Sequence, residues 1–406
     1  MSNNNKTPAI RFKGFTDTWE QRKLGEVADI VGGGTPSTSN DDYWDGDIDW
    51  YAPAEIADQI YVASSERKIT QQGYDNSSAK MLPVGTVLFT SRAGIGKTAI
   101  LRKEGCTNQG FQSIVPHINE LDSYFIFSRS EEMKRYGETV GAGSTFVEVS
   151  GKQMANMELM MPITMEEQVT IGSFFSNLDF LITLHQRKCD KLIQFKAAML
   201  KKMFPQNGAD KPEIRFKGFT DAWEQREVSN VAMISTGGTP STAINEYWNP
   251  KQVPWLSSGE VHKKYITYTD DKISNEGLNH SSARMIKQNS VLIALAGQGK
   301  TRGTVAINRI SLSTNQSIAA MTFAPDICPE FVFSNLESRY DELRKVSSGD
   351  GTRGGLNKQL VSEIQIPYTS LNEQRKIGQF FTHLDRLITL HQRKCDKYKS
   401  IKAGLI

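Results

Sequence analysis

The sequence predicts an α+β fold, in which two modules of mixed α/β structure are separated by a pair of long, antiparallel, coiled-coil-like helices. The first observation is an exact repeat: LITLHQRKCDK at Leu181–Lys191 returns at Leu387–Lys397, an offset of 206 residues in a chain of 406. The second is an apolar stripe of helical period around each copy, and the third is a set of short β-rich runs between them. A period this long excludes a solenoid and indicates a duplicated unit with pseudo-two-fold internal symmetry.

The repeat extends through both halves of the chain in further segments. They are PAIRFKGFTDTWEQR and PEIRFKGFTDAWEQR (Pro8–Arg22, Pro212–Arg226), GGTPST (Gly33–Thr38, Gly237–Thr242), SSAKM and SSARM (Ser77–Met81, Ser281–Met285), and Asn-Gln (Asn108-Gln109, Asn315-Gln316). The copies agree at their edges and diverge inside. Shared edges indicate a common scaffold, and divergent interiors predict that the two modules recognise different targets.

Composition narrows the class of protein. Hydrophobic residues make up 38% and charged residues 23%, which is typical of a soluble globular protein. No apolar run approaches the ~18 residues of a membrane span, and the amino terminus lacks the apolar region of a secretion signal. Four cysteines do not indicate a disulfide scaffold, so we expect a cytoplasmic protein. The net charge of +3 permits nucleic-acid binding without arguing for it.

Each half closes with a segment that predicts one long helix. Apolar residues recur there at steps of three and four. They are Ile171, Phe174, Phe175, Leu178, Leu181, Ile182, His185, Cys189, Leu192, Phe195, Met199 and Met203 in the first copy, and Ile377, Phe380, Phe381, Leu384, Leu387, Ile388, His391, Cys395, Tyr398, Ile401 and Leu405 in the second. Capping boxes at Thr164-x-x-Glu167 and Ser370-x-x-Glu373 predict both starts, with each hydroxyl bonding a helical amide and each carboxylate reaching back to the cap.

The two helices are expected to pair. A helix from about Glu167 to Phe204 is roughly 55 Å long at ~1.5 Å per residue, and it cannot bury its stripe alone. Two related stripes in one chain bury each other most simply as antiparallel partners. We therefore predict a first domain at 1–162, a central helix at 163–205, a second domain at 206–367 and a C-terminal helix at 368–406. Runs such as TVLFTS and SVLIALA, with short helices between, indicate that the domains are α+β.

Two motifs invite a chemical interpretation that the residues do not support. AGIGKT (Ala93–Thr98) and AGQGKT (Ala296–Thr301) resemble a phosphate-binding loop, but Ser91 and Ala294 stand where the pattern needs glycine, which favours a strand-to-strand turn. The two His-x-x-x-Cys segments of the helices could supply zinc ligands, but packing in the seam is the simpler interpretation. No hydrolase, metalloprotease or dinucleotide-binding signature is present, and the chain is predicted to be non-catalytic.

Taken together, the repeated segments resemble the specificity subunit of type I restriction–modification systems. The resemblance lies in IRFKGFTD, GGTPST followed by Tyr-Trp, TSRAGIGK with NQGFQSI, and a proline followed by E-Q-x-x-I-x-x-F-F-x-x-L-D, and it covers essentially the whole chain. It implies two target-recognition domains, each reading one half of a split site in double-stranded DNA. It also implies two methyltransferase subunits docked on the spacer helices, together with restriction subunits that translocate and cleave DNA. S-adenosylmethionine, ATP and Mg²⁺ would then belong to the partner subunits, with no cofactor in this chain and no membrane contact.

Two sets of candidate contact residues follow. The first contains side chains that can read base edges in DNA, and the second contains repeated helix residues that identical partner subunits would contact in both halves. The DNA-binding candidates are Arg92, Lys97, Asn108, Gln109 and Gln112 in the first module, and Arg284, Lys300, Arg302, Asn315 and Gln316 in the second. The partner-binding candidates are Leu181, His185, Arg187, Lys188, Leu387, His391, Arg393 and Lys394. Thr90-Ser91-Arg92 becomes Ala294-Leu295-Ala296 in the second half, so a role for Arg92 does not transfer.

Several alternatives remain at this stage. The Asn-Gln pairs also suit a structural turn, because modules with different specificities share them. Tyr43-Trp44 and Tyr247-Trp248 suit core aromatics better than base-stacking platforms. Two other kinds of protein compete with the DNA-specificity hypothesis: an enzyme that uses the Gly-Lys-Thr loops, and an adaptor that binds only proteins.

Overall fold

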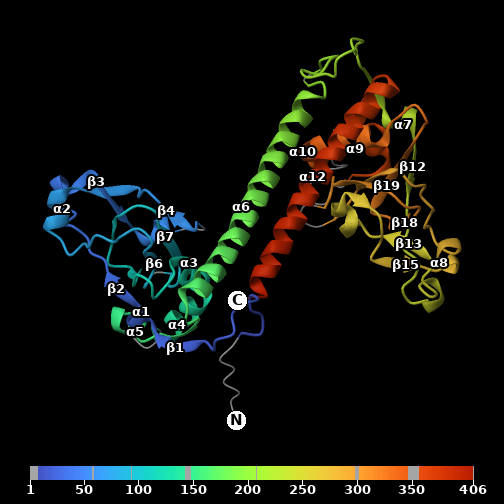
Figure 1. The fold of residues 1–406 in the computed structure, drawn as a ribbon. Helices are drawn as coiled ribbons and strands as arrows, with labels where there is room; N and C mark the ends of the chain where they lie inside the picture. The colour runs from blue at the N-terminus through green and yellow to red at the C-terminus, as the bar shows by residue number, and fades with distance from the viewer. Residues whose placement is uncertain are drawn as a thin grey trace. The chain divides into compact units, whose positions relative to one another are not determined.

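The computed structural model describes residues 8–56, 59–92, 94–141, 148–206, 208–297, 301–345 and 356–405. The chain divides into two compact units (Figure 1). The first unit comprises residues 1–184 and 394–406, and the second unit comprises residues 185–393. Each unit therefore takes one module and parts of both long helices.

The first unit builds its module from three small sheets. The five-stranded sheet has the order β2-β9-β6-β7-β4, the three-stranded sheet β5-β3-β8, and the third sheet pairs β1 with β10. Their bounds are β1 Glu20–Lys23, β2 Ala28–Gly32, β3 Trp44–Tyr51, β4 Tyr61–Val62, β5 Arg67–Ile69, β6 Val87–Phe89, β7 Thr98–Leu101, β8 Cys106–Thr107, β9 Gln112–Pro116 and β10 Glu158–Met161. The fully buried strand β6 comes from the apolar run that the sequence marks as a strand.

The second unit repeats this topology strand for strand. Its sheets have the orders β12-β19-β16-β17-β14, β15-β13-β18 and β11-β20. The bounds are β11 Glu224–Glu227, β12 Ala232–Thr236, β13 Val253–Leu256, β14 Tyr265–Ile266, β15 Asp271–Ile273, β16 Val291–Ala294, β17 Val305–Asn308, β18 Ser313–Thr314, β19 Ile318–Phe323 and β20 Gln365–Tyr368. The α+β class and the duplication predicted from the sequence are confirmed.

Short helices connect the strands in both units. In the first unit they are α1 Leu24–Val27, η1 Asp41–Tyr43, η2 Pro53–Glu55, α2 Gln71–Asp75, α3 Ser123–Ser128, α4 Ser130–Gly141 and α5 Gly151–Ala155. In the second they are α7 Val228–Val231, η3 Asn245–Tyr247, η4 Ser258–Lys263, α8 Asn275–Asn279, α9 Pro329–Ser338, α10 Tyr340–Lys345 and α11 Lys358–Ser362. The aromatic faces of α3 and α9 are buried in the apolar core of their own unit.

The predicted long helices are α6, Met165–Lys202, and α12, Leu371–Ala403. Half of each capping box forms, because the amides of Glu167 and Glu373 donate to the hydroxyls of Thr164 and Ser370 at 3.4 Å. The other half was predicted wrongly: neither carboxylate turns back to its cap. Both are buried and bind a guanidinium from the repeated Arg-Phe-Lys-Gly-Phe segment.

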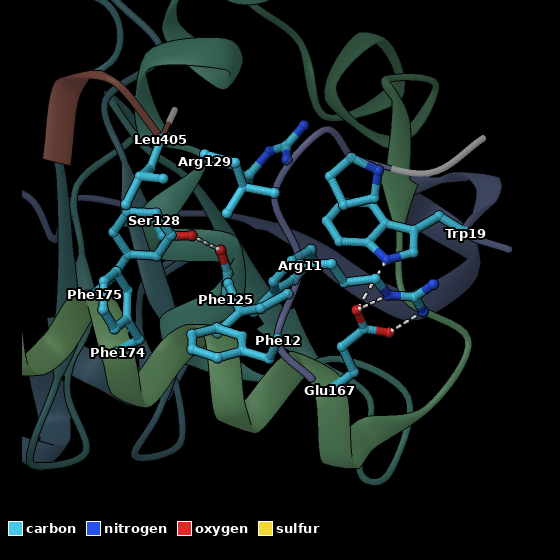
Figure 2. A pocket seen from close by; sticks show the side chains of 13 residues that line it. Arg11, Phe12, Trp19, Phe125, Ser128, Arg129, Glu167, Phe174, Phe175 and Leu405 are labelled. Atoms are coloured by element: carbon cyan, nitrogen blue, oxygen red, sulfur yellow. Dashed lines mark hydrogen bonds and ion pairs between the residues drawn. The ribbon is translucent and has the colours of Figure 1, made fainter. Parts of the chain in front are cut away.

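The clamp is the same in both units. Arg11 donates to both oxygens of Glu167 at 2.7 Å, and the indole nitrogen of Trp19 donates to the same carboxylate at 3.2 Å (Figure 2). Arg215 donates to Glu373 at 2.7 and 2.8 Å, with Trp223 at 3.2 Å. A paired, charge-assisted contact outcompetes a single bond to an amide. The repeated segment therefore ties the start of each module to the start of its long helix.

The antiparallel pairing of α6 and α12 is confirmed inside each unit. In the second unit, the Cys189 thiol lies 4.0 Å from the carbonyl of Ile388, and Lys196 binds Asp385 at 2.7 Å. In the first unit, the Cys395 thiol lies 3.9 Å from the carbonyl of Ile182. Cys189 and Cys395 hold equivalent places in the repeat and act as small buried fillers of the seam, as free cysteines commonly do. Within the described ranges, no helix is long and apolar enough to cross a membrane.

Candidate nucleic-acid interface

Two tryptophans in each unit hold the Gly-Gly-Thr-Pro-Ser-Thr loop in place. In the first unit, the indole nitrogen of Trp50 donates to the carbonyl of Gly34 at 2.8 Å, and that of Trp44 donates to Ser37 at 3.1 Å. The two rings pack edge to face with their centroids 5.2 Å apart. Trp44 is only 7% exposed, so its ring is part of the core and anchors the loop.

The second unit uses the same anchor. Trp255 donates to the carbonyl of Gly238 at 3.0 Å, and Trp248 donates to that of Ser241 at 3.2 Å. Their ring centroids lie 5.4 Å apart in the same edge-to-face arrangement. The repeated Tyr-Trp dipeptide therefore shapes a loop in both modules.

The glycines of this loop are required by close backbone approach. A Cβ atom on Gly33 would lie 2.1 Å from the carbonyl oxygen of Asn108, and one on Gly237 would lie 1.9 Å from that of Thr314. Neither distance is physically possible, and in both cases the obstacle is backbone, which cannot swing away. The next glycine, Gly34 or Gly238, approaches the second serine of the Ser-Ser-Ala segment in the same manner. Three repeated segments that are far apart in sequence thus meet at one place in each unit.

The Asn-Gln pairs complete this cluster. The side-chain oxygen of Asn108 accepts from the amide of Gly110 at 2.8 Å, and that of Asn315 accepts from Ser317 at 3.1 Å. Each asparagine therefore stabilises a turn. The next residue contacts the loop: Thr35 donates to the amide oxygen of Gln109, and Thr239 donates to that of Gln316 at 2.7 Å. Gln109 and Gln316 are both exposed.

Of the other first-module candidates, Arg92 lies beside this cluster, and Lys97 and Gln112 are located by the strands that they adjoin. Arg92 is half-buried and lies beside the turn of Asn108. A Cβ atom added at Gly110 would lie 3.5 Å from the Nε atom of Arg92. Lys97 is exposed and ends the turn between β6 and β7. Gln112 is half-buried and begins β9, opposite Gly32 of β2.

Of the remaining second-module candidates, Arg284 adjoins the loop cluster and Arg302 contacts a short helix instead. Arg284 is exposed and follows the Ser282-Ala283 segment that approaches Gly238. Arg302 donates to the carbonyl of Arg344 at 2.8 Å, on α10. Lys300 lies outside the described residues.

Sequence reasoning missed Lys80, the first-module counterpart of Arg284. Lys80 is exposed and follows Ser78-Ala79, the segment beside Gly34. The alignment of SSAKM with SSARM carried the signal, because a basic residue recurs there with a different head group. Thr35 and Thr239, which orient the glutamines, were also missed.

The first Gly-Lys-Thr segment is a strand-to-strand turn, as the sequence predicts. Strands β6 and β7 run antiparallel with Phe89 opposite Thr98, and the Thr90 amide donates to the carbonyl of Lys97 at 3.0 Å. A phosphate-binding loop instead joins a strand to a helix. The second copy falls partly outside the described residues.

Comparison with known proteins assigns the family. The model of the type I restriction modification DNA specificity domain matches residues 16–194 and again 220–399. The chain belongs to this family. A type I restriction enzyme specificity subunit of Methanocaldococcus jannaschii, MjaIX, is 27% identical over 299 residues, covering 71% of this chain and 68% of the relative. The EcoR124I/EcoR124II specificity subunit of Escherichia coli is 28% identical over 191 residues, covering 44% and 47%.

A solved structure shares the fold of the whole chain. The S subunit of a type I restriction–modification system from M. genitalium has a TM-score of 0.63 at 14% identity, with 98% of this chain and 97% of that chain covered. The specificity-domain family explains why two modules share one topology. This specificity subunit is the non-catalytic, DNA-specificity component of its system.

The long helices of the specificity subunit carry the partner-binding candidates, which fall into two groups. His185 and His391 contact each other in the seam, with their Nδ1 atoms 2.8 Å apart, and Leu181 and Leu387 are half-buried. Four basic residues instead point to solvent, two on each helix: Arg187, Lys188, Arg393 and Lys394. Across the described ranges, no cluster of three or more His, Cys, Asp or Glu side chains is placed to hold a metal ion.

Proposed function

We propose that this specificity subunit reads a split DNA site, with one half-site for each module. The observation that carries the proposal is the pair of matched loop clusters. Backbone, tryptophans, glycines and asparagines repeat in both, whereas the exposed basic side chains differ, as Lys80 and Arg284 do. A constant scaffold with variable side chains suits two readers of different base sequences.

The chemistry of the exposed side chains supports contact with the major groove. Arginine offers paired donors to the O6 and N7 atoms of guanine, and glutamine offers a donor and an acceptor to adenine. Gln109 and Gln316 have their amide oxygens held by threonine, which orients each amide group. Lys80 and Lys97 are exposed and suited to phosphate or base contact. The shared asparagines are occupied in turns, so we assign them a supporting role.

The helices would set the distance between the two modules and bind the catalytic subunits of the complex. We place the domains at 1–162 and 206–367, with spacer helices at 163–205 and 368–406. Two methyltransferase subunits would bind the repeated basic faces that contain Arg187, Lys188, Arg393 and Lys394, because identical partners need the same surface twice. These subunits and the restriction subunits would bring S-adenosylmethionine, ATP and Mg²⁺, and the complex would act on DNA in the cytoplasm.

The test is methylation of a randomised DNA library by the chain reconstituted with its methyltransferase subunits, read by methylation-aware sequencing. Arg284→Ala should relax one base position of one half-site by about 1–3 kcal/mol of discrimination and leave the other half-site unchanged. Lys80→Ala should affect only the other half-site, so each variant is the control for the other. Loss of discrimination in both half-sites from either variant would contradict the assignment of one module to one half-site.

The spacer has its own test. Four residues inserted near Gln206, about one helical turn, should change the gap between the half-sites and leave the bases of each half-site unaltered. A change in the recognised bases would show that the modules and spacer do not act separately.

A further inference from the structure

In each loop cluster, a threonine fixes the direction of an exposed glutamine. Thr35 donates to the amide oxygen of Gln109, and Thr239 donates to that of Gln316 at 2.7 Å. A side-chain amide has one acceptor end and one donor end, and this bond turns the acceptor end toward the loop. Among the residues that the structure describes, neither NH2 group donates to another protein group. The donor end is therefore the one that each glutamine presents to a ligand.

The backbone holds both partners of this hydrogen bond in place. Thr35 and Thr239 each precede a proline, which restricts the residue before it to extended conformations. Each glutamine follows the asparagine that closes a turn, through the amide of Gly110 in the first unit and that of Ser317 in the second. The direction of the amide group is thus set before a ligand arrives, which lowers the entropy lost on binding.

The same glutamine is exposed in both modules, whereas a neighbouring exposed position differs. Gln109 and Gln316 are both exposed, and so are Lys80 and Arg284, which are not alike. If each module reads one half-site, as proposed above, the glutamines present the same donor group to both half-sites. They are then suited to a feature that the two half-sites share.

We propose that Gln109 and Gln316 each read a keto base, guanine or thymine, in their own half-site. In the major groove, guanine presents O6 and thymine presents O4 as acceptors, whereas adenine and cytosine present an amino group at the equivalent place. An NH2 donor suits the first pair of bases and faces another donor in the second pair. Thr35 and Thr239 are positioning residues, because each selects the end of the amide that meets the base. This inference rests on the proposed function and deepens it.

The test exchanges the donor for an acceptor and reads base preference by methylation of the randomised library. Gln109→Glu keeps an oxygen for Thr35 and replaces the NH2 group with a second oxygen, which suits an amino base. Every base pair has one keto and one amino base, so at one position of one half-site the keto base should move to the opposite strand. We expect a change in preference of at least about fivefold. Gln316→Glu should have this effect only in the other half-site.

Threonine variants test the positioning role. Thr35→Val keeps the β-branched shape and removes the hydroxyl, so Gln109 can turn over and offer either end. At the same position, preference for one strand over the other should fall by at least about fivefold, and Thr35→Ser, which keeps a hydroxyl, should restore it. Thr239→Val is the matched control and should leave this half-site unchanged. A merely structural role for Thr35 would lower methylation of all sites without altering base preference.

Three results would overturn the proposal. In the first, Gln109→Glu lowers methylation but leaves the keto base on its original strand. In the second, only one of the two glutamate variants changes base preference. In the third, Thr35→Val and Thr35→Ser have the same effect. In all three, the wild-type chain would still select a split site, so the proposed function would stand. Failure of the wild-type chain to select any split site would overturn both. Because Gln109 is exposed, its variant should keep its melting temperature.

Discussion

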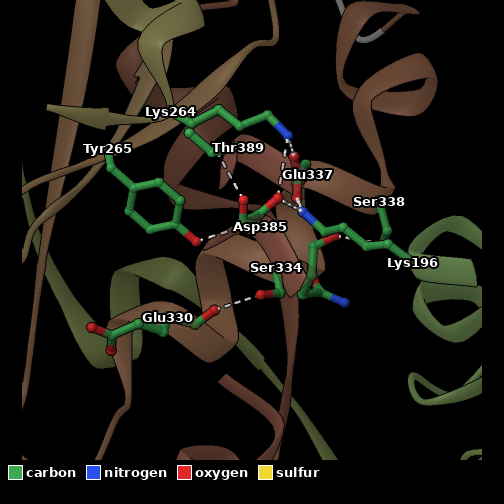
Figure 3. Close-up of polar contacts among 10 residues, drawn as sticks. Lys196, Lys264, Tyr265, Glu330, Ser334, Glu337, Ser338, Asp385 and Thr389 are labelled. Carbon is green, nitrogen blue, oxygen red and sulfur yellow. Dashed lines mark hydrogen bonds and ion pairs between the residues drawn. The ribbon is translucent and has the colours of Figure 1, made fainter. Parts of the chain in front are cut away.

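Two corresponding lysines in the helix seam should differ sharply in their contribution to stability. Lys196 of α6 binds Asp385 at 2.7 Å and Glu337 at 2.5 Å, inside a network that also contains Lys264 and Tyr265 (Figure 3). Only 7% of the Lys196 side chain is exposed. Burial would raise the pKa of Glu337, but the charges of Lys196 and Lys264 hold that pKa below its ordinary value.

The counterpart in the first unit is Lys402 of α12, which binds Asp179 at 2.6 Å. This lysine is more open to solvent, with 27% of its side chain exposed against 10% for Asp179. Tyr124 donates to the same carboxylate at 2.9 Å, as Tyr265 does to Asp385 at 3.0 Å. The two pairs are therefore alike in chemistry and differ in burial.

Lys196→Met should cost about 3–5 kcal/mol, because it leaves the buried carboxylate of Asp385 and the largely buried one of Glu337 with one lysine, Lys264, between them. Lys402→Met should cost about 1 kcal/mol, since water partly screens the remaining carboxylate. Differential scanning calorimetry of both variants measures the difference. Lys191→Met, at an exposed site on α6, is the control and should change stability by less than about 0.5 kcal/mol. Equal losses for Lys196→Met and Lys402→Met would refute the reasoning from burial.

Three further predictions concern buried polar contacts. Burial would raise the pKa of Asp49, but hydrogen bonds and charge, chiefly from Lys103, lower it to about 2. The ionised carboxylate should contribute about 2 kcal/mol to the free energy of unfolding above pH 4, and this contribution should disappear as the pH falls toward 2. In the Asp49→Asn variant, the midpoint of urea denaturation should therefore change less with pH over this range. Trp255→Phe removes the indole donor to the loop backbone, and should cost about 1 kcal/mol in thermal unfolding while weakening methylation through one half-site only. Glu373→Gln should cost about 3 kcal/mol by leaving the largely buried guanidinium of Arg215 without a counter-charge, and adding Arg215→Met should recover part of that loss in the same assay.

The fold was predictable because its strongest signals are local or repeated. The 3.6-residue period of α6 and α12 depends only on which residues are apolar, and the repeat showed that two such stripes were available to bury each other. The capping boxes located both helix starts to within two residues. What failed was the destination of Glu167 and Glu373, since a partner about 150 residues away in the chain leaves no local trace.

The candidate site was predictable only in part, for a related reason. Repeated sequence segments identified the loop, the Asn-Gln pair and the Ser-Ser-Ala segment. Their spacing in the sequence did not predict that they lie together in the structure. The three segments are brought together by close backbone contacts at Gly33 and Gly237 and at the glycine that follows each of them. Lys80 was missed although its counterpart Arg284 was selected, and the approach of Gly34 to Ser78 and Ala79 shows that Lys80 directly follows a segment of the cluster.

The division between shared and unshared residues constrains where specificity resides. A residue that both modules use to build the loop cluster, such as Asn108 or Trp50, cannot by itself distinguish two half-sites. If each module reads its own half-site, as we propose, discrimination would come from positions where the modules differ while their backbones agree, and Arg92 and the Lys80–Arg284 pair meet that condition. Exchanging Lys80 for arginine should then alter the preferred base in one half-site without disturbing the loop, because the anchors that shape the loop are the same in both modules.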